Sequence, residues 1–244
     1  VDNAGKIIRD VEPPIEPVPG NNIYLTIDVR LQAAARAALL NNMQYYNTRV
    51  GDPDRYTQGV VIVMDVRTGE ILALVSHPTF ENNRMARFIP AYYYEQLSRD
   101  PARPLFNHAI SAEHAPGSVY KLATAIGALN EGVVTPEQVI FDPGVITLEQ
   151  RFAPNDPRPR FEEYVCYTYK TTGEGHGDVN FVKGVGVSCN VYFYKLGGGY
   201  QNEVPNGGLG IWRLKEYAQA LGYGRTFGIE LPGESDGLVP DPTW

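Results

Sequence analysis

The chain of 244 residues has no run of about 18 apolar residues, so nothing in the sequence predicts a membrane-spanning helix. It also has no surplus of basic residues, because 21 Lys and Arg stand against 28 Asp and Glu, a net charge of −7. A nucleic-acid-binding domain normally carries a basic patch. The charge therefore argues against nucleic acid as a partner.

Cysteine and histidine are scarce as well. The chain has two cysteines and four histidines, and the histidines follow none of the spacings typical of metal sites. The sequence therefore predicts no metal site and no other cofactor. For Cys166 and Cys189 two interpretations stay open, namely a disulfide, whose geometry a sequence cannot supply, or two small buried side chains.

The composition that remains is that of an ordinary globular protein, with 43% hydrophobic and 20% charged residues. Residues 1–20 are rich in proline and acidic residues and predict an extended linker. Asp28 is expected to cap a helix, and residues 59–75 to form a β-hairpin. Further helices are predicted at 117–130, 180–187, 191–196 and 207–221, whereas 141–178 is expected to be irregular.

The most informative motif is Ser118-Val119-Tyr120-Lys121, at the start of the helix predicted over 117–130. Residues three apart share a helix face, so the amine of Lys121 is expected to reach the hydroxyl of Ser118. A serine hydroxyl is a weak nucleophile that needs an adjacent base, and the lysine fits that role. Alone, the four residues are also typical of a helix start followed by a surface lysine.

The same helix carries apolar residues at helical spacing, and this stripe is expected to be buried. Its members are Leu122, Ala125, Ile126 and Leu129. Further along the chain comes a second short motif, Ser188-Cys189-Asn190. The order of the two motifs and the residues around them carry more information than either motif alone.

With both motifs in view, the chain resembles the transpeptidase domain of class B penicillin-binding proteins, the serine acyltransferases that cross-link peptidoglycan. The resemblance extends along nearly the whole chain, with features of the type 2, cell-elongation branch; its matching segments are 20–32, 59–73, 175–177, 188–194, 227–232 and 242–244. Phe227 and Glu230 depart from that branch's Thr-Gly-Ile-Asp-Leu pattern. The resemblance implies an α+β fold of the penicillin-binding or serine β-lactamase-like type, with a helix-rich subdomain and an antiparallel sheet.

The family's third motif, Lys-Thr/Ser-Gly on a later strand, is missing. The segment Lys170-Thr171-Thr172-Gly173 has an extra residue and precedes Ser188, so it is interpreted as a polar loop. The resemblance then implies that residues 1–20 are the tail of a non-catalytic pedestal domain. Residues 21–244 would be the N-terminal part of a transpeptidase domain, truncated before its later strands, with the hairpin at 59–75 as its only sheet. Ser118 in such a piece is expected to be acylated poorly, because the oxyanion donor on the strand of the third motif would be missing.

The resemblance also implies a role for each motif residue. Ser118 would attack the D-alanyl-D-alanine stem peptide, with Lys121 as general base. Ser188 would relay the proton to the leaving nitrogen, and Asn190 would hold the substrate amide and help to fix Lys121. The implied partners are peptidoglycan stem peptides, β-lactams and a glycosyltransferase of the elongation machinery. The implied location is the extracytoplasmic face of the bacterial membrane, with an N-terminal anchor outside this chain.

Two other functions stay open on the sequence. One is a class D β-lactamase or β-lactam sensor domain, and the other is a catalytically silent scaffold of the elongation machinery. The lactamase relatives usually have a small apolar residue at the third place of the second motif, so Asn190 favours the transpeptidase. The sequence does not name the stem-peptide composition or the acceptor amine.

Overall fold

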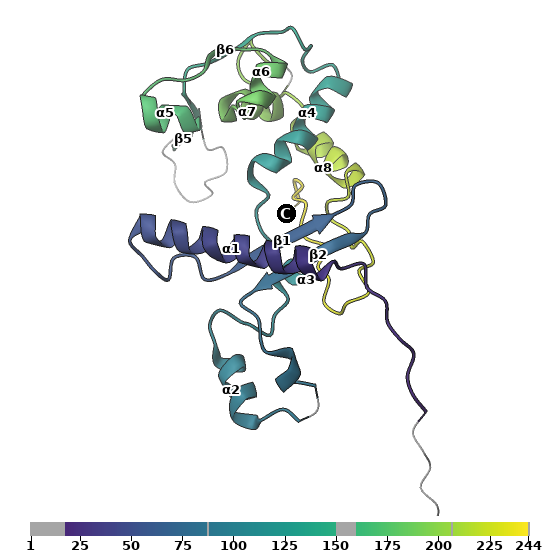
Figure 1. Ribbon diagram of the computed structural model, residues 1–244. Helices are drawn as coiled ribbons and strands as arrows, with labels where there is room; N and C mark the ends of the chain where they lie inside the picture. Colours follow the sequence, from purple (N-terminus) through teal and green to yellow (C-terminus); the bar gives the residue numbers. More distant parts are fainter. Residues whose placement is uncertain (1–17, 87, 150–159, 206, 244) are drawn as a thin grey trace, which may run out of the picture. The chain divides into compact units, whose positions relative to one another are not determined.

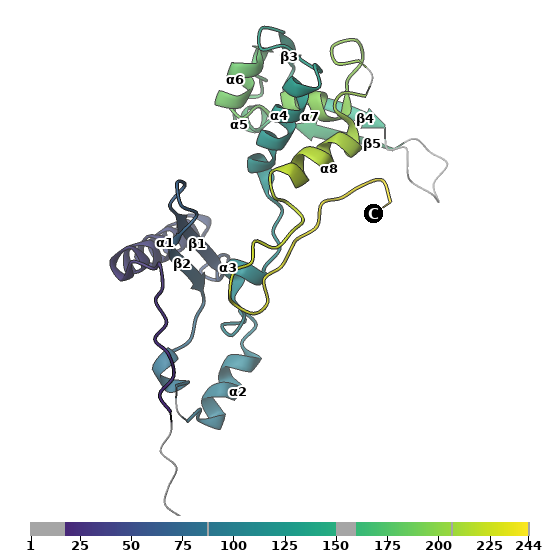
Figure 2. The ribbon, with the colours of Figure 1, turned by 90° about the vertical axis from the view of Figure 1, so that its right-hand side faces the viewer.

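A computed structural model describes the chain except for residues 1–17, 87, 150–159, 206 and 244. The chain divides into two compact units, Val1–Ala109 and Ile110–Trp244. Both combine helices with small antiparallel sheets (Figure 1, Figure 2). The linker predicted over 1–20 falls mostly outside the described residues, and the assignment of 21–244 to one domain stays a prediction. Within the described part, no helix has both the length and the apolar character that crossing a membrane requires.

The first unit is a helix packed on a β-hairpin, with shorter helices beside it (Figure 1). Its elements are α1 (Val29–Val50), β1 (Gly59–Met64), β2 (Ile71–His77), the 3₁₀ turn η1 (Asn82–Arg84), α2 (Ala91–Arg99) and, at the boundary, α3 (His108–Ser111). The Asp28 carboxylate caps α1 by accepting hydrogen bonds from two N–H groups of its first turn. The side-chain amide of Gln32 exchanges two hydrogen bonds with the backbone of Leu74, which ties α1 to β2. The predicted cap and hairpin are both confirmed.

The second unit is mainly helical and carries two further two-stranded sheets, β3 with β6 and β4 with β5. Its elements are η2 (Gly117–Tyr120), α4 (Lys121–Asn130), β3 (Ile140–Asp142), β4 (Val145–Glu149), β5 (Phe161–Val165), α5 (Tyr167–Thr172), β6 (Gly177–Val179), α6 (Phe181–Gly186), α7 (Asn190–Gly198) and α8 (Gly210–Ala220). The four helices predicted over 117–221 are confirmed, although the first turn of 117–130 is 3₁₀ rather than α.

Two expectations about the middle of the chain were wrong. Residues 141–178, expected to be irregular, contain most of β3, β4, β5, α5 and most of β6, so the hairpin at 59–75 is not the only sheet. Strands of three to five residues are too short to show a period between turn-forming residues. Residues 170–173 are not a polar loop either, because α5 runs to Thr172 and ends at Gly173 in the left-handed conformation.

Helix α7 forms the centre of the second unit, with α4 and α8 beside it (Figure 2). The predicted buried stripe of α4 is correct only for Ala125. Leu122, Ile126 and Leu129 are exposed, and the helix instead buries its small residues, listed as Ala123, Thr124, Ala125, Gly127 and Ala128. The small face allows close packing, since a Cβ on Gly127 would lie 2.7 Å from Leu209 Cδ2.

Candidate active site

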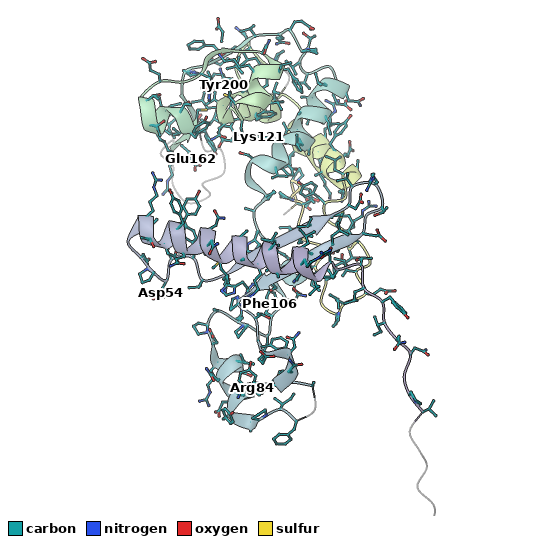
Figure 3. The ribbon with its side chains drawn as sticks, in the orientation of Figure 1. Asp54, Arg84, Phe106, Lys121, Glu162 and Tyr200 are labelled. Carbon is teal, nitrogen blue, oxygen red and sulfur yellow. The ribbon has the colours of Figure 1, made fainter. Side chains whose placement is uncertain are left out.

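Ser118 and Lys121 lie where the 3₁₀ turn η2 passes into α4. Gly117 adopts a φ of +58°, which a residue with a side chain rarely tolerates, and so permits the sharp entry into the turn. Ser118 is exposed, whereas Lys121 is partly buried next to α7 (Figure 3). The nucleophile candidate is thus open to solvent while the base candidate is held inside the unit.

The ammonium group of Lys121 is held by the second motif. Its Nζ donates to the carbonyl oxygen of Ser188 at 2.7 Å, to Ser188 Oγ at 3.1 Å and to Asn190 Oδ1 at 2.6 Å. The ring of Phe193 lies 5.6 Å away, within the range of a cation–π contact. Three of the four motif residues predicted from the sequence therefore form one hydrogen-bonded group, which we call the lysine site.

The backbone around Ser188 explains how its carbonyl reaches the lysine. Ser188 follows the end of α6 and has a φ of +51°, a left-handed conformation that is uncommon for residues other than glycine. The N–H groups of Ser188 and Cys189 close this turn by donating to the carbonyls of Val185 and Gly184. Strained backbone of this kind is concentrated at functional sites. Here it presents both oxygens of Ser188 to Lys121.

Asn190, the first residue of α7, is fixed from the other side by a strand. Its Nδ2 donates to the carbonyl of Val165 at 3.2 Å, at the end of β5. The bond determines which end of the amide faces the lysine, so that Oδ1 accepts from Lys121. The sequence did not indicate a role for Val165, because it acts through its backbone and its side-chain type carries no information.

Burial lowers the pKa of Lys121, and the nearby thiols of Cys189 and Cys166 act in the opposite direction. Desolvation disfavours the charged ammonium, so a larger fraction of Lys121 is the neutral amine at a given pH. A neutral amine keeps two N–H donors and gains one lone pair, so it can accept a proton from a serine hydroxyl. The environment therefore moves Lys121 towards the protonation state that a general base requires.

Ser118 remains outside this network. Among the described residues, no hydrogen bond joins its hydroxyl to Lys121 Nζ, which is occupied by Ser188 and Asn190. In a site without substrate, catalytic hydrogen bonds are often long and tighten only when the substrate binds. The pairing of Ser118 with Lys121 therefore stays a prediction.

A pocket of about 810 Å³ borders the same segment. Its lining includes Pro116 and Tyr120, with residues of α8 and of the chain after it, such as Leu214 and Phe227. None of the four motif residues is among its described lining residues. The candidate active site is therefore defined by the side-chain network of Lys121 and not by this pocket.

A second polar group lies directly behind the Ser188–Asn190 segment. It consists of Asp142, Cys166, His176 and Cys189, whose ligand atoms all lie within 4.8 Å of one another, and we call it the Asp142 cluster. Asp142 Oδ2 accepts from Cys189 Sγ at 3.1 Å and lies 2.9 Å from His176 Nδ1. Cys166 Sγ lies 3.3 Å from the same nitrogen and 3.9 Å from Cys189 Sγ. Both cysteines are free and fully buried, which confirms the interpretation of small buried side chains.

The carboxylate of Asp142 is the charged centre of this cluster. Burial alone would raise its pKa, but hydrogen bonds from the His176 N–H, the Cys189 thiol, the Gly144 N–H and the His176 ring together lower it to about 2. The carboxylate is therefore ionised at neutral pH although only 1% of the side chain is exposed. Burial also raises the pKa of the Cys189 thiol, so this thiol stays protonated in the absence of another charge.

The geometry of the Asp142 cluster fits a tetrahedral metal ion. With metal–ligand bonds of about 2.0 to 2.3 Å, tetrahedral donors lie about 3.3 to 3.8 Å apart. Four of the six donor separations run from 2.9 to 3.9 Å, close to those edges, and all six lie within 4.8 Å. Two sulfurs, one imidazole and one carboxylate are ligands that zinc prefers. The sequence offered no indication, because the four donors come from four segments and Asp142-Pro143-Gly144 is typical of a turn.

The fold and the lysine site define an α+β protein of the penicillin-binding transpeptidase type. The family model for the penicillin binding protein transpeptidase domain matches residues 59–244. The chain therefore belongs to this family.

Individual relatives agree with the family. The peptidoglycan D,D-transpeptidase MrdA of Acinetobacter baumannii is 34% identical over 94% of this chain, which spans only 29% of that relative's length. The crystal structure of Pseudomonas aeruginosa PBP2 in complex with WCK 5153 has 31% sequence identity and a TM-score of 0.69. The match covers 93% of this chain and 43% of the PBP2 chain. The complex of PBP2 with MreC from Helicobacter pylori has 26% sequence identity and a TM-score of 0.67. The match covers 89% of this chain and 34% of the matched chain.

Proposed function

We propose that the chain is the part of a serine D,D-transpeptidase that supplies the nucleophile, the general base and the proton relay. The observation that carries this proposal is the lysine site, in which Lys121 Nζ is bound by Ser188 and Asn190 one turn after an exposed Ser118. The substrate would be the D-alanyl-D-alanine end of a peptidoglycan stem peptide, in keeping with the name of the A. baumannii relative.

The reaction begins with attack of Ser118 Oγ on the penultimate carbonyl. The hydroxyl proton passes to neutral Lys121, and the carbonyl becomes a tetrahedral oxyanion. Ser188 Oγ, 3.1 Å from Lys121 Nζ, then carries the proton to the nitrogen of the departing D-alanine. An amine of a second stem peptide attacks the resulting ester, and the same groups return the proton. Asn190 orients Lys121 throughout and offers its amide to the substrate backbone.

The same site would bind β-lactams, whose strained amide imitates the peptide. The P. aeruginosa relative is seen in complex with WCK 5153, and the H. pylori relative is seen in complex with MreC. We propose β-lactams as ligands, and, as a partner, a glycosyltransferase of the elongation machinery. We place the domain on the extracytoplasmic side of the membrane, where peptidoglycan is cross-linked.

Fluorescent penicillin labelling of the protein that carries this chain tests the function. Stable labelling is expected, and Ser118→Ala should abolish it, because removal of a serine nucleophile lowers turnover by about 10⁶-fold. Ser98→Ala, at an exposed serine of α2, is the matched control and should label normally. Rapid loss of label would instead favour a β-lactamase, and absence of label would favour a silent scaffold.

We also propose that the Asp142 cluster binds a zinc ion that stabilises the fold. The supporting observation is the set of four convergent donors, four of whose six separations lie close to the edges of a zinc tetrahedron. Metal analysis of protein dialysed against zinc and then against buffer should find about one zinc per chain. A Cys166→Ser, Cys189→Ser double variant should bind far less. Protein with no zinc above the level of the double variant would contradict the site.

A further inference from the structure

Cys166 and Cys189 form a pair of thiols that the proposed reaction does not use. Both are free and fully buried, and their sulfur atoms lie 3.9 Å apart. We propose that this pair is a modification site, a dithiol that closes to a disulfide in competition with zinc and thereby alters the lysine site. The effect on catalysis rests on the proposed transpeptidase function, whereas the bond itself does not.

The separation of the two sulfurs allows a bond with little movement. A disulfide has an S–S length of about 2.05 Å, so the sulfurs must approach by about 2 Å. The backbones are held, since the N–H of Cys166 donates to Gly144 and that of Cys189 to Gly184. Side-chain rotation of the two cysteines is therefore the movement that closes the gap.

The chemical step is a two-electron oxidation by a small disulfide such as oxidised glutathione. One thiol attacks the glutathione disulfide, forms a mixed disulfide and releases one glutathione thiol. The second thiol then attacks the mixed disulfide, which forms the internal S–S bond and releases the second glutathione. Two S–H bonds break in the protein, and the two protons and two electrons end on two glutathione molecules. Because both sulfurs are buried, the oxidant needs local opening, and uncatalysed exchange takes minutes to hours.

Formation of the Cys166–Cys189 disulfide would act on the lysine site from both sides. Cys166 directly follows Val165, whose carbonyl accepts from Asn190. Cys189 lies between Ser188 and Asn190, both of which bind Lys121. A bond between the sulfurs therefore links the two segments that hold Lys121. It also removes the Sγ of Cys189 from the N–H of Tyr192, which it now caps at the start of α7.

Zinc and the disulfide exclude each other, because the ion needs both sulfurs as thiolates. When free zinc is about 100 times its dissociation constant, about one molecule in 100 is metal-free. The rate of oxidation should then fall about 100-fold, provided that only the metal-free form reacts. The two thiols would thus link the metal state of the domain to its redox state.

The test uses the folded full chain with oxidised glutathione, with and without zinc, followed by intact mass spectrometry and peptide mapping. The expected product is a chain lighter by two hydrogens, with a Cys166–Cys189 cross-linked peptide, formed about 100-fold more slowly with zinc. Cys166→Ser and Cys189→Ser are matched controls that should give only mixed disulfides with glutathione. Mixed disulfides or free thiols in the unsubstituted chain would overturn the disulfide. Equal rates with and without zinc, in protein that metal analysis shows to hold the ion, would overturn the competition.

Penicillin labelling separates this inference from the proposed function. The oxidised protein should label at a rate different from that of the reduced protein, and a reducing agent should restore the original rate. Equal labelling by the two forms would contradict the link to the lysine site. If no form labels, the transpeptidase function fails, while the mass measurement still decides whether the disulfide forms.

Discussion

The segment Ser188–Cys189–Asn190 serves two regions that differ in their physical chemistry. Ser188 and Asn190 bind Lys121 in the partly buried lysine site. Cys189, between them, faces the Asp142 cluster, in which all members but the partly buried His176 are buried. Adjacent side chains of one short segment thus bind Lys121 on one side and line the buried cluster on the other. The comparison suggests that substitutions can affect chemistry and stability separately, because the two regions share a backbone but not side chains.

The largest expected effect is on the lysine site. Lys121→Met keeps the length of the side chain and removes the amine, so acylation by fluorescent penicillin should slow by about 10² to 10⁴-fold, the usual contribution of a general base. The midpoint of thermal unfolding should change little, since the lysine is only partly buried. Lys170→Met, on the exposed face of α5, is the control and should acylate at the original rate. If Lys121→Met also lowered the midpoint of thermal unfolding substantially, the distinction between the two regions would fail.

The next prediction concerns pH. If Lys121 must be neutral to act, acylation should rise with pH through the lysine pKa and then level off, with a midpoint below the ordinary value of 10.5 because burial lowers it. Asn190→Asp places a carboxylate on the ammonium, where the amide oxygen now lies 2.6 Å away. The charge should raise the lysine pKa by about 1 to 3 units and move the profile to higher pH. A profile that does not move would exclude Lys121 as the titrating base.

Stability is the expected readout for the Asp142 cluster. Asp142→Asn replaces one oxygen with an NH₂ group, so buried donors of His176 or Cys189 lose their acceptor. The free energy of unfolding in urea should fall by about 1 to 3 kcal/mol. Asp178→Asn, at an exposed carboxylate of β6, is the matched control and should stay within about 0.5 kcal/mol. An Asp142→Asn protein that unfolds like the control would show that the cluster contributes no stability.

The smallest effect concerns α4, which carries Lys121 at one end. Gly127→Ala should destabilise by about 1 kcal/mol, because the new methyl group would lie 2.7 Å from Leu209 and 2.8 Å from Tyr217, while alanine's helix propensity partly offsets the clash. Leu122→Ala, at a side chain that is 56% exposed, should change the free energy of unfolding by less than about 0.5 kcal/mol. If urea unfolding showed a larger loss of unfolding free energy for Leu122→Ala than for Gly127→Ala, the larger apolar residues of α4 would have to be buried.

Local patterns in the sequence predicted the local structure well. Asp28 before a helical stretch predicted the cap, and the β-branched run after Gly59 predicted the hairpin. The α4 stripe was wrong because hydrophobicity was taken as the guide to burial. In the structure α4 packs through its small residues, and a close helix approach depends on side-chain volume. The short strands of 141–178 were missed because three to five residues are too few to show a period, and pairing with another segment is what forms them.

The sequence by itself determined the side chains available at the candidate site: a serine, a lysine one turn later, and a Ser-Cys-Asn motif. Only the tertiary structure decided which groups meet. It turned Ser188 towards Lys121, fixed Asn190 through the carbonyl of Val165, and gathered four donors around Asp142. The physical reason is that hydrogen bonds and metal geometry depend on distances between segments, and residue type says nothing about distance.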